Sequence, residues 1–335
     1  MTFFSEHTTL RIGGPIDEWI HATTMQQVVD EVLDSDANRV PVLVLGGGSN
    51  VVAPDAGFRG RVVHIATRGI EVVEPGVLRI AAGEAWDDVV SASVERGWAG
   101  IEALAEIPGL SGATPIQNVG AYGQDVSQVL MSLTVLERAS GQIVDMGPEQ
   151  CGFGYRTSAL KREPHARVVL EVTLRLRPST TNVVTYPELA RVLGIQVGES
   201  APLAAIRDAV VDLRRSKGMV LDEHDHDTWS AGSFFTNPIV DAGTAARFPP
   251  ECPRYPAVDG VKLSAAWLIE AAGMGRGFRM SSDARAAVSN KHSLALVNLG
   301  GATSGEVMEL AHAVQVKVRA MHDVALDIEP VVLMA

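Results

Sequence analysis

The sequence predicts an α+β fold. Three observations support this prediction: many short strand patterns, few helical patterns among them, and no regular alternation of strands with helices. Runs rich in β-branched residues and bounded by glycine or proline are typical of strands. Between residues 46 and 178 such runs occur at 62–66, 70–73, 77–81, 130–138, 142–146 and 168–176, and one helical pattern, 86–94, stops at Gly97.

Helical patterns are clearer towards the two ends of the chain. Thr23 and Gln26 form a capping-box pattern before an amphipathic stretch, and Thr303 and Glu306 repeat this pattern before a longer one. Further expectations are a helix that opens at Pro202, an apolar helix over 262–271, a short strand that runs into a glycine turn over 9–14, a turn over 186–189 and a terminal strand over 325–333.

Composition indicates an ordinary globular protein. The chain has 335 residues, a length that is enough for two or three domains. Of these residues 46% are hydrophobic and 20% charged, as is usual in globular proteins. The net charge of -12 argues against a general affinity for nucleic acid or anionic membranes. Two cysteines without a CxxC motif, and no signal-peptide or membrane-spanning pattern, predict a reducing, cytoplasmic location.

The stretch IPGLSGATPIQNVGAYGQD, residues 107–125, is too rich in glycine and proline for a regular helix or strand. Its small side chains build little core, but glycine lets backbone N–H groups approach a ligand closely, as in phosphate-binding nests. Long irregular loops in compact domains are usually functional. We therefore favour a ligand-binding loop over an ordinary surface loop.

A second glycine-rich segment, Gly46 to Asn50, follows the buried strand pattern PVLVL. A dinucleotide site of the Rossmann type would continue into a long helix. Here the chain continues VVAPDAGFRG, which predicts another strand and a turn, so the Rossmann interpretation fails. A phosphate-contacting loop in a different fold and a tight strand-to-strand turn remain equally compatible with this segment.

Three polar residues stand in settings that suit chemistry. Arg156, in CGFGYRTSALK, could clamp a carboxylate or enolate through two N–H donors, or form a surface ion pair. Ser233, between Gly232 and two phenylalanines, could donate a proton in a dry site, although most such serines are structural. Glu329 lies in an apolar stretch, which suits either a paired structural acid or a catalytic one.

Two charged segments have simpler explanations. The basic cluster 214–218, RRSKG, follows a predicted helix and matches its dipole, although it is also a candidate anion site. The segment DEHDHD, residues 222–227, is best interpreted as a solvated acidic loop, and whether it binds a cation stays open. We predict no metal site among the functional residues.

The motifs LGGGSN, IPGLSGATPIQNVGAYGQD, FGYRTS, GSFFTNP and the terminal IEP, in this order and spacing, resemble the UDP-N-acetylenolpyruvoylglucosamine reductase family over nearly the whole chain. The resemblance implies an FAD-binding fold of the vanillyl-alcohol-oxidase (PCMH) type with a separate α/β substrate-binding domain. It implies FAD-binding subdomains at 1–66 plus 322–335 and at 67–218, and a substrate domain at 219–321. NADPH would reduce non-covalently bound FAD, which would pass hydride to the enolpyruvyl double bond of a UDP-sugar.

The resemblance also assigns roles to residues. Arg156 would stabilise the developing enolate, Ser233 would protonate the carbon next to the carboxylate, and Glu329 would assist at the same enolate. The cofactor-binding residues would be Gly46, Gly47, Gly48, Ser49, Asn50, Pro108, Gly109, Ser111, Gly112, Ala113, Thr114, Gly120, Ala121 and Tyr122. The substrate-binding residues would be Tyr155, Tyr186, Lys217, Asn237, Tyr255 and Lys262.

Two departures from the family pattern are mild. TLRIGG replaces a more common FGIGG-like start, and LSGAT stands in the long loop. Two other functions stay open: a different flavin oxidoreductase of the same fold, and a non-catalytic nucleotide-binding module. We expect a monomer that acts on a small molecule and binds neither nucleic acid nor membrane.

Overall fold

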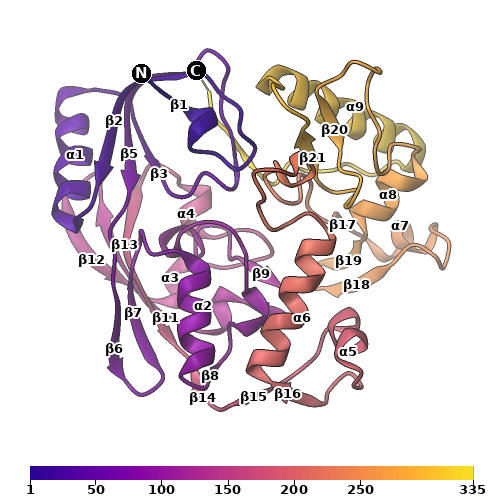
Figure 1. The fold of residues 1–335 in the computed structure, drawn as a ribbon, viewed down its shortest axis with the longest axis horizontal. Coiled ribbons are helices and arrows are strands. Elements are labelled where there is room, and N and C mark those ends of the chain that lie inside the picture. Colours follow the sequence, from indigo (N-terminus) through magenta and orange to yellow (C-terminus); the bar gives the residue numbers. More distant parts are fainter. Residues whose placement is uncertain (335) are drawn as a thin grey trace. The chain divides into compact units, whose positions relative to one another are not determined.

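The computed structural model describes residues 1–334, and the chain divides into two compact units. The terminal unit contains Met1–Pro15, Gly48–Phe58 and the chain from Ser216 onward. The central unit contains Ile16–Gly47 and Arg59–Arg215. Each unit mixes helices and sheets, as the α+β prediction requires (Figure 1). The finer division at residues 66, 218 and 321 stays a prediction.

One layer of the central unit is a small sheet covered by a helix. Strands β2 (Pro15–Ala22), β5 (Phe58–Ile65) and β3 (Val42–Leu45) are neighbours in that order, and β3 pairs with β5 in parallel. Helix α1 (Met25–Asn38) packs its buried valines onto one face of this sheet. Its N-cap is Thr24, one residue after the expected Thr23, and the Thr24 side chain accepts from the backbone N–H of Gln27.

The larger sheet of the central unit is antiparallel, with the strand order β12-β11-β13-β7-β6. It confirms five of the six predicted strands, and β5 of the smaller sheet confirms the sixth. Helix α2 (Trp86–Glu95) stops before Gly97, which has a φ of +67°. The bounds are β6 (Ile70–Glu74), β7 (Val77–Ala81), β11 (Leu130–Glu137), β12 (Gln142–Met146), β13 (Arg167–Arg175), α2 (Trp86–Glu95), α5 (Pro187–Leu193) and α6 (Leu203–Ser216). Side chains from these helices and strands form one core around Trp86 and Leu133.

Short elements complete the central unit. They are β8 (Trp98–Ala99), β9 (Gly120–Ala121), β10 (Gln124–Asp125), β14 (Arg177–Pro178), β15 (Thr181–Val183), β16 (Ser200–Pro202), α3 (Pro148–Cys151) and α4 (Ala159–Arg162), with 3₁₀ turns at Glu102–Leu104, Ser111–Ala113 and Val126–Gln128. Residues 107–125 therefore contain a single 3₁₀ turn and a two-residue hairpin, in agreement with an irregular loop.

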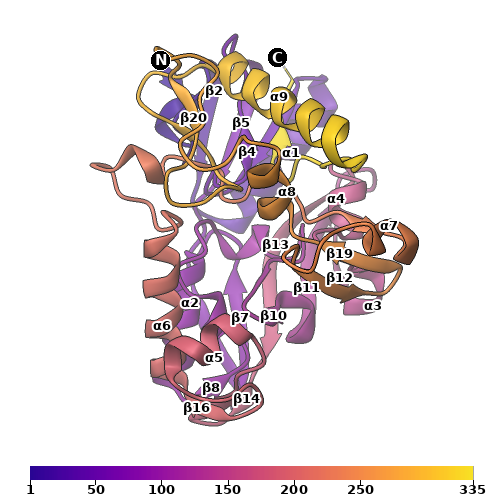
Figure 2. The same cartoon turned by 90° about the vertical axis from the view of Figure 1, so that its right-hand side faces the viewer.

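The terminal unit has its own core, in which α8 packs against α9 (Figure 2). Its strands form the orders β17-β19-β18, β20-β21 and β22-β4. The bounds are β1 (Thr2–Phe3), β4 (Val51–Val52), β17 (Ile239–Val240), β18 (Arg254–Ala257), β19 (Gly260–Leu263), β20 (Ala286–Val288), β21 (Leu296–Asn298), β22 (Val331–Val332), α7 (Ala242–Ala246), α8 (Ala265–Ala271) and α9 (Ser304–His322), with 3₁₀ turns at Phe4–Glu6 and His226–Thr228.

Some local expectations were wrong. Residues 9–14 contain no strand. The expected turn at 186–189 is instead the start of α5, residues 187–193, because Pro187 occupies the first helical position, where a helix tolerates proline. The helix expected from residue 262 begins at Ala265, because Ser264 caps it. The terminal strand is confined to β22, which follows Pro330, a residue that cannot donate to a ladder.

No helix within residues 1–334 is both long and apolar enough to cross a bilayer.

Candidate functional site

The two predicted cofactor loops meet in the central unit. The α carbon of Gly109 lies so close to Gly47 that a β carbon added at Gly47 would be 2.9 Å from it. Gly46, directly before Gly47, faces Leu110 and Ala113. The structure therefore brings together glycine loops that are about sixty residues apart in sequence, through an approach that glycine permits. The rest of the first loop, Gly48 to Asn50, belongs to the terminal unit.

Several amides of the long loop already have protein partners. The Ser111 N–H and hydroxyl both donate to the Glu84 carbonyl, at 2.8 and 3.0 Å. The Gly112 N–H donates to the Ala82 carbonyl, and Thr114 donates through its hydroxyl to Ser111. These three predicted cofactor residues therefore shape the loop from its buried side. Pro108 and Ala113, by contrast, are exposed on it.

The loop ends in a tight hairpin with Tyr122 at its tip. Strands β9 and β10 pair so that Tyr122 and Gly123 are the two turn residues, with φ values of +49° and +89°. Two positive φ values characterise a type I′ turn, which is a strained conformation for a tyrosine. The Tyr122 ring meets the Tyr186 ring edge to face, with centroids 5.4 Å apart. Burial raises the pKa of Tyr122 to about 12, so the phenol is neutral at physiological pH.

Arg156 lies against this loop. Its Nη2 donates to the Gly120 carbonyl at 2.7 Å and its Nη1 reaches the Asn118 carbonyl at 3.5 Å. The Ser158 hydroxyl donates to the Ile116 carbonyl at 2.5 Å, which attaches the whole segment to the loop. Tyr155 is exposed, with its ring centroid 5.7 Å from the guanidinium carbon of Arg156. Arg156, Tyr155, Tyr122 and Tyr186 all belong to the central unit.

Ser233 and Glu329 are brought together in the terminal unit. The backbone N–H of Glu329 donates to the carbonyl of Phe234, the residue after Ser233, at 3.0 Å. An isolated bridge joins Phe235 to Ile328 beside this contact. Phe234 and Phe235 are fully buried and Glu329 is 9% exposed, whereas Ser233 is half-buried. Residues far apart in sequence thus share one short backbone pairing, in apolar surroundings.

The other predicted substrate-binding residues also lie in the terminal unit. Tyr255 and Lys262 are cross-strand partners on β18 and β19, and the ammonium nitrogen is 5.9 Å from the ring centroid. The Asn237 side chain accepts from the N–H of Ala265 at 2.9 Å, so it supports the start of α8. Lys217 is half-buried just after α6.

The acidic loop 222–227 uses its acids internally. Asp225 pairs with Lys291, which holds the pKa of that carboxyl below its usual range, and Asp227 accepts from the Asn290 N–H. The ring nitrogen Nδ1 of His226 lies 2.7 Å from the Leu299 carbonyl. Among residues 1–334, no group of three or more His, Cys, Asp or Glu side chains is placed to hold a metal ion.

Sequence reasoning missed the importance of Arg214. This residue is buried on α6, and its Nε donates to the Glu106 carbonyl at 3.1 Å. Burial lowers the pKa of Arg214, while Tyr122, Glu106 and Asp87 act in the opposite direction. A signal was present, because Arg214 is four residues after Val210 and so lies on the apolar face of its helix.

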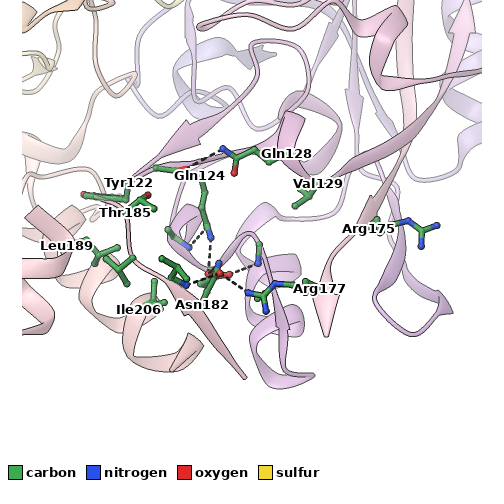
Figure 3. A pocket seen from close by; sticks show the side chains of 17 residues that line it. Tyr122, Gln124, Gln128, Val129, Arg175, Arg177, Asn182, Thr185, Leu189 and Ile206 are labelled. Atoms are coloured by element: carbon green, nitrogen blue, oxygen red, sulfur yellow. Dashed lines mark hydrogen bonds between the residues drawn. The ribbon is translucent and has the colours of Figure 1, made fainter. Parts of the chain in front are cut away.

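A cavity of about 370 Å³ is lined in part by Tyr122 and Gly123, the turn residues of the hairpin (Figure 3). Glu102, fully buried, accepts there from the Gly100 N–H, Gln124 Nε2 and Asn182 Nδ2 at 2.7, 2.8 and 2.5 Å. Tyr122 is the one predicted site residue that lines this cavity in the described chain. The cavity therefore adjoins the loop without containing the candidate catalytic residues.

The residues present fit a non-covalently bound flavin nucleotide. Close packing at Gly47 leaves no space for a side chain between the two loops, so backbone can face a ligand. Neither loop contains a histidine or cysteine that could attach a flavin covalently.

Comparisons with known proteins agree with this geometry. Residues 17–147 match the model of an FAD binding domain, and residues 223–333 match the C-terminal domain of UDP-N-acetylenolpyruvoylglucosamine reductase. The chain is 49% identical to the Nocardia farcinica protein of that name, over 98% of this chain and 87% of the relative. It is 48% identical to the Saccharopolyspora erythraea protein of the same name, over 98% and 93%.

A solved structure shows the same fold. The crystal structure of UDP-N-acetylenolpyruvylglucosamine reductase from Thermus caldophilus superposes with a TM-score of 0.67, at 24% identity, over 99% of this chain and 98% of that one. At such identity the likeness concerns the fold alone, and it confirms the predicted PCMH-type FAD-binding architecture. The sequence relatives and the two matched domains show that this chain belongs to the UDP-N-acetylenolpyruvoylglucosamine reductase family.

Proposed function

We propose that this protein uses FAD and NADPH to reduce the enolpyruvyl group of UDP-N-acetylenolpyruvoylglucosamine, giving UDP-N-acetylmuramate for peptidoglycan. The observation that carries the proposal is the backbone hydrogen bond from Glu329 to Phe234, the residue directly after Ser233, in a chain with an FAD-binding domain. The protein would act in the cytoplasm as a monomer, and its loss would impair cell-wall synthesis, cell shape and cell division.

The chemistry adds one hydride and one proton across a carbon–carbon double bond. Bound FAD would supply the hydride, after accepting it from NADPH. Negative charge then develops on the carboxylate side of the substrate and must be stabilised and quenched. Arg156 would stabilise this charge through its N–H donors, which the loop carbonyls of Asn118 and Gly120 help to orient.

Ser233 would deliver the proton to the carbon next to the carboxylate and regain it from solvent. A serine hydroxyl is a weak acid, but the enolate is a strong base, and a positioned donor needs only to be in reach. Glu329, held next to this segment through its own backbone N–H, would assist at the same enolate. The exposed Tyr155 and the residues Tyr186, Lys217, Asn237, Tyr255 and Lys262 would contact the UDP-sugar.

The decisive experiment follows the two halves of the reaction separately. The purified FAD-loaded protein should oxidise NADPH continuously only when the enolpyruvyl nucleotide is present, because without it oxidation stops once the flavin is reduced, and denaturation should release intact FAD. Ser233→Ala should still allow NADPH to bleach the flavin, but substrate should restore the flavin colour much more slowly, by about 10²-fold or more. A variant that failed in flavin reduction and kept normal reoxidation would contradict the proton-donor role.

Other functions predict different results. A different oxidase of the same fold would turn over without the enolpyruvyl nucleotide. A non-catalytic nucleotide-binding module would show no substrate-dependent oxidation of NADPH, and Ser233→Ala would change nothing.

A further inference from the structure

Two histidines on neighbouring strands of the central unit face each other. His21 lies on β2 and His64 lies near the end of β5, the adjacent strand of the sheet. Their Nδ1 atoms are 3.1 Å apart, and the two ring planes differ by 27° with centroids 5.1 Å apart. At this distance the Nδ1–H of one ring can donate to the bare Nδ1 of the other, and the tautomers of the two rings decide which one donates.

The separation of these nitrogens also suits two ligands of one metal ion. Imidazole nitrogens bind Zn²⁺ and similar ions at about 2.0–2.1 Å, so two of them are about 2.9 Å apart at a right angle and about 3.4 Å apart at the tetrahedral angle. The observed 3.1 Å falls between these values. The spacing of the two Nδ1 atoms therefore suits a single ion without movement of the strands.

The surroundings leave the pair accessible. The His21 side chain is exposed and His64 is half-buried. The buried valines of α1 pack on the face that carries Val63 and Ile65, which is opposite to His64 because neighbouring residues of a strand point to opposite faces. With no third protein ligand grouped nearby in the described chain, water would complete the coordination shell.

We propose that His21 and His64 form a binding site for a divalent first-row transition-metal ion, with both Nδ1 atoms as ligands. The proton on the donating Nδ1 moves to Nε2 of the same ring, so both imidazoles stay neutral and each binds the ion through a bare Nδ1. Imidazole ligands suit Cu²⁺, Ni²⁺ and Zn²⁺, and affinity for a given nitrogen site is highest for Cu²⁺. Mg²⁺ and Ca²⁺ prefer oxygen ligands and should not bind here.

The proposed metal site lies close to the first cofactor loop. In the parallel pairing of β3 with β5, His64 is the partner of Leu45, and Leu45 directly precedes Gly46. The ion would therefore lie at the end of the sheet where the first cofactor loop begins. This inference does not depend on the proposed reaction, because it concerns two side chains that have no part in that chemistry.

Trp19 provides a built-in reporter. Its ring lies 5.2 Å from the His64 ring, at an interplanar angle of 21°. Paramagnetic Cu²⁺ quenches an adjacent indole, so Cu²⁺ bound at His64 should quench Trp19 more than the other four tryptophans of the chain. Comparison with Trp19→Phe isolates this contribution to the emission.

The test titrates the FAD-loaded full chain with Cu²⁺ alone, followed by calorimetry, tryptophan emission and electron paramagnetic resonance. We expect one ion per chain with nitrogen hyperfine couplings from two imidazoles. His21→Gln and His64→Gln should each weaken binding by about tenfold or more, equivalent to about 1.4 kcal/mol or more. His165→Gln, which changes an exposed histidine elsewhere in the central unit, should bind as the unchanged protein does.

Three results would overturn the proposal. The first is that His21→Gln and His64→Gln both bind Cu²⁺ as tightly as the unchanged protein does, while their thermal unfolding and FAD content are normal. Another is loss of the ion on His224→Gln or His226→Gln, which would move the site to the acidic loop. The third is displacement of Cu²⁺ by Mg²⁺ at a similar concentration, which would indicate that the ion is attracted by net charge alone.

Discussion

In the central unit, Nε of Arg214 donates a hydrogen bond to the carbonyl of Glu106 at 3.1 Å. Glu106 directly precedes the long glycine loop and has a φ of +55°, an uncommon conformation for a residue other than glycine. The Glu106 N–H donates in turn to Asp87, which pairs with Arg207. A buried cation on α6 thus fixes the point where the cofactor loop begins.

Replacement of Arg214 should therefore weaken both the fold and FAD binding. Arg214→Met should lower the free energy of unfolding by about 1–3 kcal/mol, because the half-buried Glu106 carbonyl loses its donor. Urea unfolding of the FAD-free protein measures this change, and recovery of flavin fluorescence on dilution measures the release of FAD. Arg215→Met is the matched control, because Arg215 is exposed on the same helix. Equal effects of the two substitutions would contradict the role given to Arg214.

The adjacent glycines Gly46 and Gly47 should respond differently to alanine. At Gly46 an added β carbon would meet its nearest atom at 3.8 Å, an ordinary contact. At Gly47 it would lie 2.9 Å from the backbone of Gly109, which cannot move without the loop. Gly47→Ala should cost about 1–3 kcal/mol and Gly46→Ala much less. Thermal unfolding of the FAD-free variants makes the comparison, and similar melting temperatures would show that the two loops are not in contact as described.

Tyr122 predicts a specific dependence of stability on pH. Its pKa is raised to about 12 in the folded chain, mainly by burial, whereas an unfolded tyrosine titrates at about 10. The folded state therefore holds the phenolic proton more tightly, and this contribution is fully present below pH 10 and is lost as pH rises towards 12. Between these values the free energy of unfolding should fall by about 2–3 kcal/mol more than it does in Tyr122→Phe.

Urea unfolding of both proteins at several pH values from 9 to 11.5 tests this prediction. Cys151, whose pKa burial raises to about 11, titrates in the same range, but it is present in both proteins and its effect cancels in the difference. Parallel stability curves for Tyr122→Phe and the unchanged chain would show that the phenol is not buried in solution.

Helices and strands that depend mainly on neighbouring residues in the sequence could be predicted from it. The apolar runs at Val77–Ala81 and Gln142–Met146 form strands as expected, and the capping box of Thr303 and Glu306 begins α9 as expected. The short segment after Tyr186 was mistaken for a turn because Pro187 is equally compatible with a turn and with the first position of a helix.

Long-range relationships could not be obtained in the same way. The contact of Gly47 with Gly109 and the pairing of Glu329 with Phe234 depend on tertiary structure, and no spacing in the chain encodes them. The resemblance to a family identified the residues involved, but not their contacts. Arg214 was noted only as part of a basic cluster, because its burial depends on how α6 packs against the start of the loop.

Glu329 offers a way to separate chemistry from folding in the proposed reaction. Its link to Phe234 runs through its backbone N–H, so Glu329→Gln should keep the pairing and the unfolding temperature. The carboxylate is absent in this variant, and substrate-driven reoxidation of the flavin should slow by about 10²-fold or more, while reduction by NADPH stays close to normal. Stopped-flow absorbance of the flavin measures both steps. The control is Asp327→Asn, which changes an exposed acid two residues away and should leave both steps unchanged. A Glu329→Gln variant slowed only in reduction by NADPH would place Glu329 at the nicotinamide instead of the enolate.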